Sequence, residues 1–168
     1  MNRLARHSMA FPLICGLAAL LCLVGCASPR ADPPVSAELV RVEVRQALEK
    51  FSDIAGRGKL AEFMSQFDDG ADILLVGSDK GEVFKGRAAM EGWLGRLLAS
   101  NRFSWQMDRV DIGHQHETAW AFVEGKMIVK DVAGKVQGTT PYRFTAVLVK
   151  KEDGWAWRLF HGSVPAGH

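Results

Sequence analysis

Residues 142–149 read YRFTAVLV, a strand-like run whose two sets of alternating side chains are both largely apolar. One set is Phe144, Ala146 and Leu148, and the other is Thr145, Val147 and Val149. Because successive side chains of a strand point to opposite faces of its sheet, this run needs cover on both faces. It therefore predicts a sheet that is buried on its two sides.

The period of two continues through the C-terminal half of the chain. Strands are predicted over 103–107, 119–129 and 155–163, with turns near Gly113, within 131–138 and at Asp153-Gly154. The last strand also carries large apolar groups on both faces, with Trp155, Trp157 and Leu159 opposite Ala156 and Phe160. If helices cover one face, a second copy of the chain is the economical cover for the other, so we expect a homodimer packed through the sheet.

The N-terminal half has helical spacing instead. Apolar residues recur three to four positions apart from Val40 to Phe51, from Leu60 to Phe67 and, most regularly, from Met90 to Leu98. Short strands are expected at 73–76 and 83–84, between the second and third helices. Helices followed by long antiparallel strands predict an α+β fold, with the helices packed on one face of the sheet.

The first 25 residues have the pattern of an export signal. Arg3 and Arg6 precede an apolar run over 9–24, and no acidic residue occurs before Asp32. The alternative is a permanent membrane span, but this run is marginally short for one and Pro12 interrupts its start. The residues that end it, Leu23-Val24-Gly25-Cys26, resemble the bacterial lipobox, in which the cysteine receives a diacylglycerol and becomes the mature N-terminus.

The lipobox resemblance divides the chain into three parts. We expect a signal peptide over 1–25, a lipidated N-terminus and proline-rich linker over 26–35, and one domain over 36–165. In lipoproteins, Ala27 after the cysteine favours the outer membrane, so the domain is expected in the cell envelope, facing the periplasm. The membrane is then a partner only through the lipid on Cys26.

Charge and cysteine content exclude several classes of function. The formal net charge is +2, and the chain without its first 25 residues has 19 basic and 19 acidic side chains, so no basic field for nucleic acid is present. Cys15 and Cys22 leave with the signal peptide and Cys26 takes the lipid. The domain then has no thiol for a disulfide, a nucleophile or a metal, and we expect no cofactor.

Several short segments together resemble a known family. They are Asp69-Gly70-Ala71-Asp72 before a short strand, GEVFKGR over 81–87, RFTAVL over 143–148, Asp153-Gly154-Trp155, and the His161-x-Ser163 ending followed by Pro165. Their order is similar to that of SnoaL-like domains of the NTF2-like superfamily, which are related to the association domain of calmodulin-dependent kinase II. The resemblance implies three helices packed on a curved, mostly antiparallel sheet to form a cone with a pocket.

This fold carries isomerases, cyclases, dehydratases, transport adaptors and oligomerising modules, so the resemblance does not decide an activity. The leading interpretation is a domain that binds a small, mostly apolar molecule in the cone without established catalysis. The candidate pocket residues are Trp105, Trp120, Tyr142, Arg143, His161 and Ser163. The sequence leaves open which strand face points into the cone and which packs against the second copy.

Two other functions remain open. One is an enzyme similar to ketosteroid isomerase that uses a buried carboxylate, for which Asp72, Asp108, Asp111 and Glu124 are the candidates. The other is a non-catalytic dimerisation or interaction module whose cone is filled by side chains. A carboxylate deep in the cone with a raised pKa would favour the first, and a cavity smaller than a few water molecules would favour the second.

Three further motifs are weaker. His161 and Ser163 could pair as base and nucleophile, but no third group or oxyanion donor accompanies them. The kinase association domain binds carboxylates with arginines, one of which aligns with Gly162 here, which leaves Arg143 and Arg158 as substitutes. His114-x-His116 has metal-ligand chemistry but no third ligand, so a solvated turn is the preferred interpretation and no metal is expected.

Overall fold

The computed structural model describes residues 36–166. Its elements are α1 (Ala37–Arg57), α2 (Leu60–Met64), β1 (Leu74–Val76), β2 (Val83–Lys85), α3 (Arg87–Ser100), β3 (Asn101–Gln115), β4 (Thr118–Asp131), β5 (Val136–Lys151) and β6 (Gly154–Ser163). The expected signal peptide and the linker with Cys26 lie outside the described residues. The expected domain over 36–165 falls within them.

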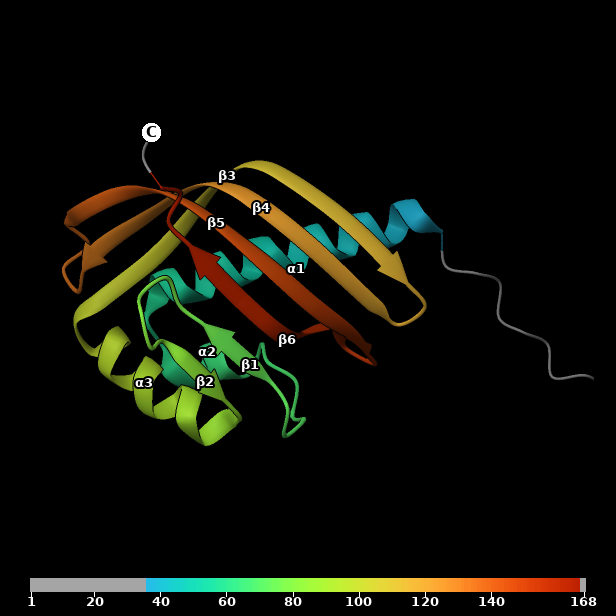
Figure 1. Cartoon of the computed structure of the whole chain (residues 1–168), viewed down its shortest axis with the longest axis horizontal. Coiled ribbons are helices and arrows are strands. Elements are labelled where there is room, and N and C mark those ends of the chain that lie inside the picture. The colour runs from blue at the N-terminus through green and yellow to red at the C-terminus, as the bar shows by residue number, and fades with distance from the viewer. Residues whose placement is uncertain (1–35, 167–168) are drawn as a thin grey trace, which may run out of the picture. The chain divides into compact units, whose positions relative to one another are not determined.

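The six strands form one curved sheet in the order β2-β1-β6-β5-β4-β3. All neighbours are antiparallel except β1 and β6, which run parallel. Figure 1 shows α1 running behind the long strands, so the helix covers the sheet face that points away from the viewer. The predicted α+β fold, with three helices on one face of a curved and mostly antiparallel sheet, is confirmed.

Local signals fix the bounds of α1. The Ser36 side chain caps the helix by accepting a hydrogen bond from the Leu39 backbone N–H at 3.1 Å. Gly58 ends it in the left-handed conformation, with φ of 68°, and its N–H donates to the carbonyl oxygens of Ile54 and Ala55. The stripe that packs on the sheet is buried and apolar: Val40, Val44, Leu48, Phe51, Ile54 and Ala55.

The strands differ from the sequence prediction where the ladder is irregular. The β5–β6 register shifts between Val147 and Leu148, so that Leu148 pairs with Trp157 but Val147 pairs with Leu159. The extra residue on β6 lets Trp157 and Phe160 both face α1. The prediction that these two rings lie on opposite faces was therefore wrong.

A second difference concerns the turn expected near Gly113. Strand β3 continues through Gly113 to Gln115, and the chain reverses at His116, whose φ is 52°. Gly113 serves packing instead, because a Cβ there would collide with the Trp120 indole that lies across it. A wide aromatic ring therefore covers a glycine on the sheet face opposite α1.

The core is a cluster of aromatic rings centred on Phe51. Its ring stacks on Trp157 with centroids 4.0 Å apart, and the centroids of Phe63 and Phe160 lie 4.6 Å and 5.7 Å away. Stacked and tilted pairs of this kind stabilise a core beyond the area that they bury. The cluster ties α1 to α2 and to β6.

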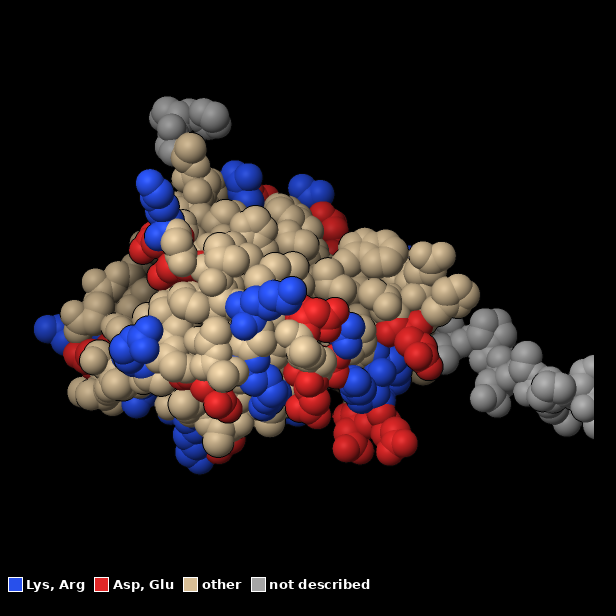
Figure 2. Space-filling view, turned by 60° about the horizontal axis from the view of Figure 1, so that its bottom comes forward, with Lys and Arg blue, Asp and Glu red and all other residues tan. Residues whose placement is uncertain are grey.

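The surface carries both signs of charge. Figure 2 shows Lys and Arg side chains intermingled with Asp and Glu over one face, with broad uncharged areas between them. Within residues 36–166, no helix combines the length and the hydropathy needed to cross a bilayer.

Asp68 is a buried carboxylate that joins two distant segments. Its side chain is 2% exposed; it accepts a hydrogen bond from Arg158 Nε at 3.0 Å and pairs with Lys151 Nζ at 2.6 Å. These contacts tie the loop after α2 to β5 and β6. Hydrogen bonds from Lys151 and then Arg158 lower the pKa of Asp68 to about 2, against an ordinary value of 3.8.

We predict that Asp68→Asn lowers the free energy of unfolding by about 2 kcal/mol at pH 7. Because the folded-state pKa is the lower one, the contribution of Asp68 is complete above about pH 4 and disappears as the pH falls toward 2. Urea unfolding at several pH values measures both effects. Asp69→Asn, at a side chain that is 96% exposed, is the control, and equal losses for the two variants at pH 7 would contradict the prediction.

Candidate ligand-binding site

A cavity of about 190 Å³ lies between the helices and the concave face of the sheet. Every helix and every strand except β2 contributes to its wall. The apolar lining residues are Phe51, Ala55, Phe63, Leu75, Trp93, Leu94, Leu97, Leu98, Phe103, Trp105, Met127 and Phe160. The cavity is therefore the part of the cone that the core leaves unfilled.

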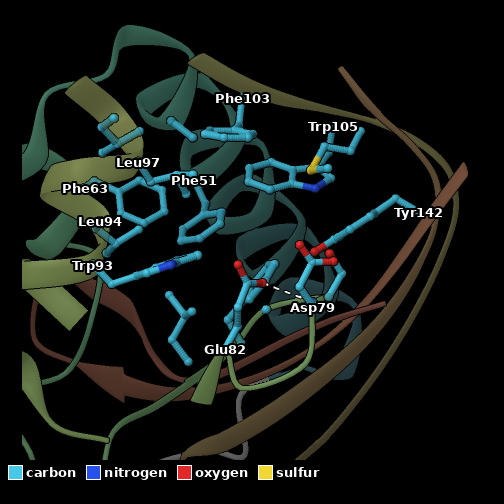
Figure 3. Close-up of a pocket in the computed structure, with 17 residues that line it drawn as sticks. Phe51, Phe63, Asp79, Glu82, Trp93, Leu94, Leu97, Phe103, Trp105 and Tyr142 are labelled. Carbon is cyan, nitrogen blue, oxygen red and sulfur yellow. Dashed lines mark hydrogen bonds between the residues drawn. The ribbon is translucent and has the colours of Figure 1, made fainter. Parts of the chain in front are cut away.

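The polar groups of the lining gather at one end of the cavity, which we call the polar end: Ser78, Asp79, Glu82 and the hydroxyl of Tyr142. Figure 3 shows the oxygens of Asp79, Glu82 and Tyr142 on the same side of the cavity. The first three residues belong to the turn between β1 and β2, where Ser78 and Asp79 are exposed and Glu82 is half-buried. The polar end thus faces solvent, whereas the rest is enclosed by rings and aliphatic groups.

The turn holds Glu82 in place. The Gly77 N–H donates to the Glu82 carbonyl oxygen at 2.8 Å, and the Asp79 backbone N–H donates to Glu82 Oε2 at 3.1 Å. A Cβ at Gly77 would collide with the Glu82 side chain, so the glycine leaves the room that this carboxylate occupies. The Glu82 carboxylate is therefore positioned before any ligand arrives.

Tyr142 crosses from β5 to the polar end. It is 5% exposed, and burial is the main cause that raises its pKa to about 12. A hydrogen bond with Ser78 opposes the rise, while the charges of Glu82 and Asp79 add to it. The phenol is thus a neutral hydroxyl at physiological pH, able to donate or accept a hydrogen bond.

Gly162 makes room for this tyrosine. It lies on β6 opposite Phe144, facing α1, and a Cβ at this position would collide with the Tyr142 hydroxyl. The resemblance to the kinase association domain implied an arginine at the aligned position. Here the tyrosine ring occupies the space into which such a side chain would extend.

Trp105 forms another part of the wall. Its backbone N–H donates to Ser52 Oγ at 2.9 Å, which joins β3 to α1. Its indole Nε1 is buried and has no hydrogen-bond partner among the described residues. An unpaired buried donor is costly, so an acceptor atom on a bound molecule would be favourable here.

Of the six candidate pocket residues, Trp105 and Tyr142 line this cavity. Trp120, Arg143, His161 and Ser163 do not; they lie on the opposite face of the sheet. The register explains the division, because Tyr142 faces α1 and its neighbour Arg143 must then face away. Arg143 contacts Glu124 at 3.3 Å there, and His161 is exposed.

The carboxylates proposed for an isomerase-like site lie elsewhere. Asp108 accepts a hydrogen bond from Gln106, and Asp111 and Glu124 pair with arginines on the face away from α1. Asp72 is exposed and lies 3.6 Å from Arg158. None of the four lines the cavity.

The two carboxylates that do line it, Asp79 and Glu82, are not among the site residues predicted from the sequence. Residues 78–81 have the composition of a turn, and a turn has no periodicity to show which way its side chains point. The available signal was the segment over 81–87, which contains Glu82 and contributes to the family resemblance.

The other motifs do not form a site in the described part of the chain. Arg158 pairs with Asp68 rather than reaching the cavity. His114 lies near the end of β3 and His116 in the following turn. Among residues 36–166, no group of three or more His, Cys, Asp or Glu side chains is arranged to hold a metal ion.

Comparison with known proteins identifies the family. The family model of the SnoaL-like domain matches residues 44–167. The chain belongs to the SnoaL-like domain family. No curated protein matches it in sequence.

Solved structures share the fold of this SnoaL-like domain. A protein of Streptomyces avermitilis named "putative dehydratase from the NTF2-like family" matches with a TM-score of 0.69 and 17% identity, over 79% of this chain and 100% of that one. A "putative calcium/calmodulin dependent protein kinase II association domain" of Xanthomonas campestris matches with a TM-score of 0.63 and 16% identity, over 75% of this chain and 88% of that one. A "putative scytalone dehydratase" of Novosphingobium aromaticivorans matches with a TM-score of 0.65 and 14% identity, over 77% of this chain and 87% of that one. At these identities the likeness shows the fold.

We predict that Gly162→Ala lowers the free energy of unfolding by about 1–3 kcal/mol, because the new methyl group must displace the Tyr142 ring. Gly138→Ala on β5 is the matched control, since a Cβ there meets no atom within 4 Å. Urea unfolding of both variants measures the difference. Equal stability of the two variants would show that Tyr142 does not fill the space beside Gly162.

Proposed function

We propose that this SnoaL-like domain binds a small, mostly apolar molecule in its cavity, and that it does so as a lipid-anchored protein of the bacterial cell envelope. The observation that supports binding is the enclosed aromatic space of about 190 Å³ with a single polar end. Ligand sites in proteins commonly combine an apolar wall with a few placed polar groups.

The size of the cavity limits the ligand. An apolar cavity of roughly 150 Å³ holds benzene, and a water molecule takes about 30 Å³ of liquid volume. The space in this domain therefore suits a molecule of one ring with a short substituent, and it exceeds a few water volumes. This favours binding over the alternative of a cone filled by side chains.

A second candidate function is a proton-transfer enzyme. Two carboxylates and a neutral phenol meet at the polar end, which are groups that general acid–base chemistry uses. Two of the similar structures carry dehydratase names, which apply to those proteins. In this chain Asp79 is exposed and Glu82 lies toward solvent, whereas the isomerase-like hypothesis requires a carboxylate deep in the cone. Binding is therefore the preferred function.

We predict that toluene binds the purified chain and that Leu97→Trp abolishes this binding, because the larger ring fills the cavity. Leu39→Trp, at an exposed position of α1, is the matched control and is expected to bind as the wild type does. Isothermal titration calorimetry measures toluene binding by both variants, once cooperative unfolding has shown that each variant is folded. Equal binding by the two variants would place the toluene site outside the cavity.

The proposal of a lipid anchor rests on the sequence of residues 1–26. We predict that Cys26→Ala moves the protein from the membrane fraction to the soluble fraction of bacterial cells or blocks its processing, because the acyl chains are lost. Cys22→Ala, within the apolar run, is the control and is expected to leave the protein on the membrane. A Cys26→Ala chain that is processed normally and stays fully membrane-bound would refute lipid anchoring.

We further propose a homodimer formed through the sheet face opposite α1. That face carries Trp120, which is 46% exposed, and half-buried apolar side chains of β4, β5 and β6: Phe122, Val147, Val149 and Leu159. Arg143 and Glu124 lie on the same face. A face that offers apolar groups and both signs of charge suits a symmetric contact with a copy of itself.

Sedimentation velocity at micromolar concentration is expected to show a dimer. Trp120→Lys should weaken it at least tenfold, because a charge replaces a central aromatic contact. Val132→Lys, in the exposed turn between β4 and β5, is the control and should leave the dimer intact. A wild-type chain that sediments as a monomer would contradict the proposal.

A further inference from the structure

The charged groups around the cavity are all of one sign. Among the seventeen residues that line it, Asp79 and Glu82 are the charged ones, and no Lys, Arg or His is present. Lys80 lies between them in the turn, but it is exposed and does not line the cavity. The polar end is therefore negative.

These two carboxylates have no cationic partner. Within residues 36–166, neither Asp79 nor Glu82 forms an ion pair, whereas Asp68, Glu124 and Asp111 each contact an arginine or a lysine. Glu82 is the better placed of the two, because it is half-buried and is held by the Asp79 N–H. A charge that is partly removed from water and left unpaired is available to a ligand of opposite sign.

The pKa of Tyr142 reflects the same negative electrostatic field. The charges of Glu82 and Asp79 both contribute to the rise in its pKa, which means that they disfavour a negative charge on the phenol oxygen. The field that disfavours a phenolate also disfavours an anionic ligand at this end. Arg143 and Arg158, the two arginines considered for a carboxylate ligand, are held by Glu124 and Asp68 away from the cavity.

We propose that the molecule which occupies the cavity carries a positively charged amine, placed at the polar end against Glu82 and Asp79, with a single-ring apolar body among the aromatic side chains. This inference rests on the proposed binding function and names its ligand class. Aromatic faces attract cations as well as apolar groups, so the wall near the polar end supports the same charge. The Tyr142 hydroxyl is within the same group of polar atoms and accepts a hydrogen bond from the ammonium.

Three probes of similar size test the charge preference: 2-phenylethylamine, which is a cation at pH 7, 2-phenylethanol, which is neutral, and phenylacetate, which is an anion. Calorimetry on the purified full chain should show the amine binding about tenfold tighter than the alcohol, and the acid binding weakest. The preference for the amine should shrink as salt rises, because the carboxylates are near solvent, while binding of the alcohol should not weaken.

Glu82→Gln is the deciding variant, because glutamine keeps an oxygen that accepts from the Asp79 N–H while the charge is lost. It should bring the affinity for the amine down to that for the alcohol. Glu91→Gln, on the exposed side of α3, is the matched control and should preserve the tenfold preference.

The outcomes separate the two proposals. The amine inference would be overturned if the wild-type chain bound the alcohol as tightly as the amine, or if it bound the acid most tightly. Either result would leave the binding function standing. Retention of the amine preference by Glu82→Gln would also overturn it. Failure of all three probes to bind would overturn the binding function itself, and the amine inference with it.

Discussion

The stacking of Phe51 on Trp157, with ring centroids 4.0 Å apart, is the contact on which the rest of the domain depends. It places the long helix α1 against β6 on the concave face of the sheet. Because Trp157 shares that face with Phe160 only through the register shift beside Val147, the core requires an irregular strand. A regular ladder would turn one of these rings to the other face and open the core.

The cavity follows from this arrangement. The ring cluster fills the cone where α1, α2 and β6 meet, whereas α3 approaches the sheet farther along and leaves about 190 Å³ between them. The turn between β1 and β2 reaches the open side with Ser78, Asp79 and Glu82. The turn between β1 and β2 therefore supplies the charge of the cavity, whereas the helices and the other strands supply its apolar wall. In the proposed binding function, the turn would determine the class of ligand and the wall would determine its size.

The sequence predicted the architecture because periodicity is a property of whole segments. Alternation in 142–149 and the stripe from Met90 to Leu98 identified strand and helix, and their order indicated an α+β fold. Site residues depend on finer features. Alternation says that Tyr142 and Arg143 face opposite ways, but only the packing of α1 decides which enters the cone. Asp79 and Glu82 lie in a turn, where neither the helical nor the strand periodicity indicates the direction of a side chain.

Xenon binding to crystals of the protein is the direct test for an unfilled apolar cavity beside the Phe51–Trp157 stack, because xenon occupies apolar cavities without needing any particular hydrogen bond. Xenon density is expected between Phe51, Trp105 and Leu97 in the wild type, with Phe51 still stacked on Trp157. A crystal structure in which these side chains have closed together, with no xenon inside the cone, would contradict this expectation.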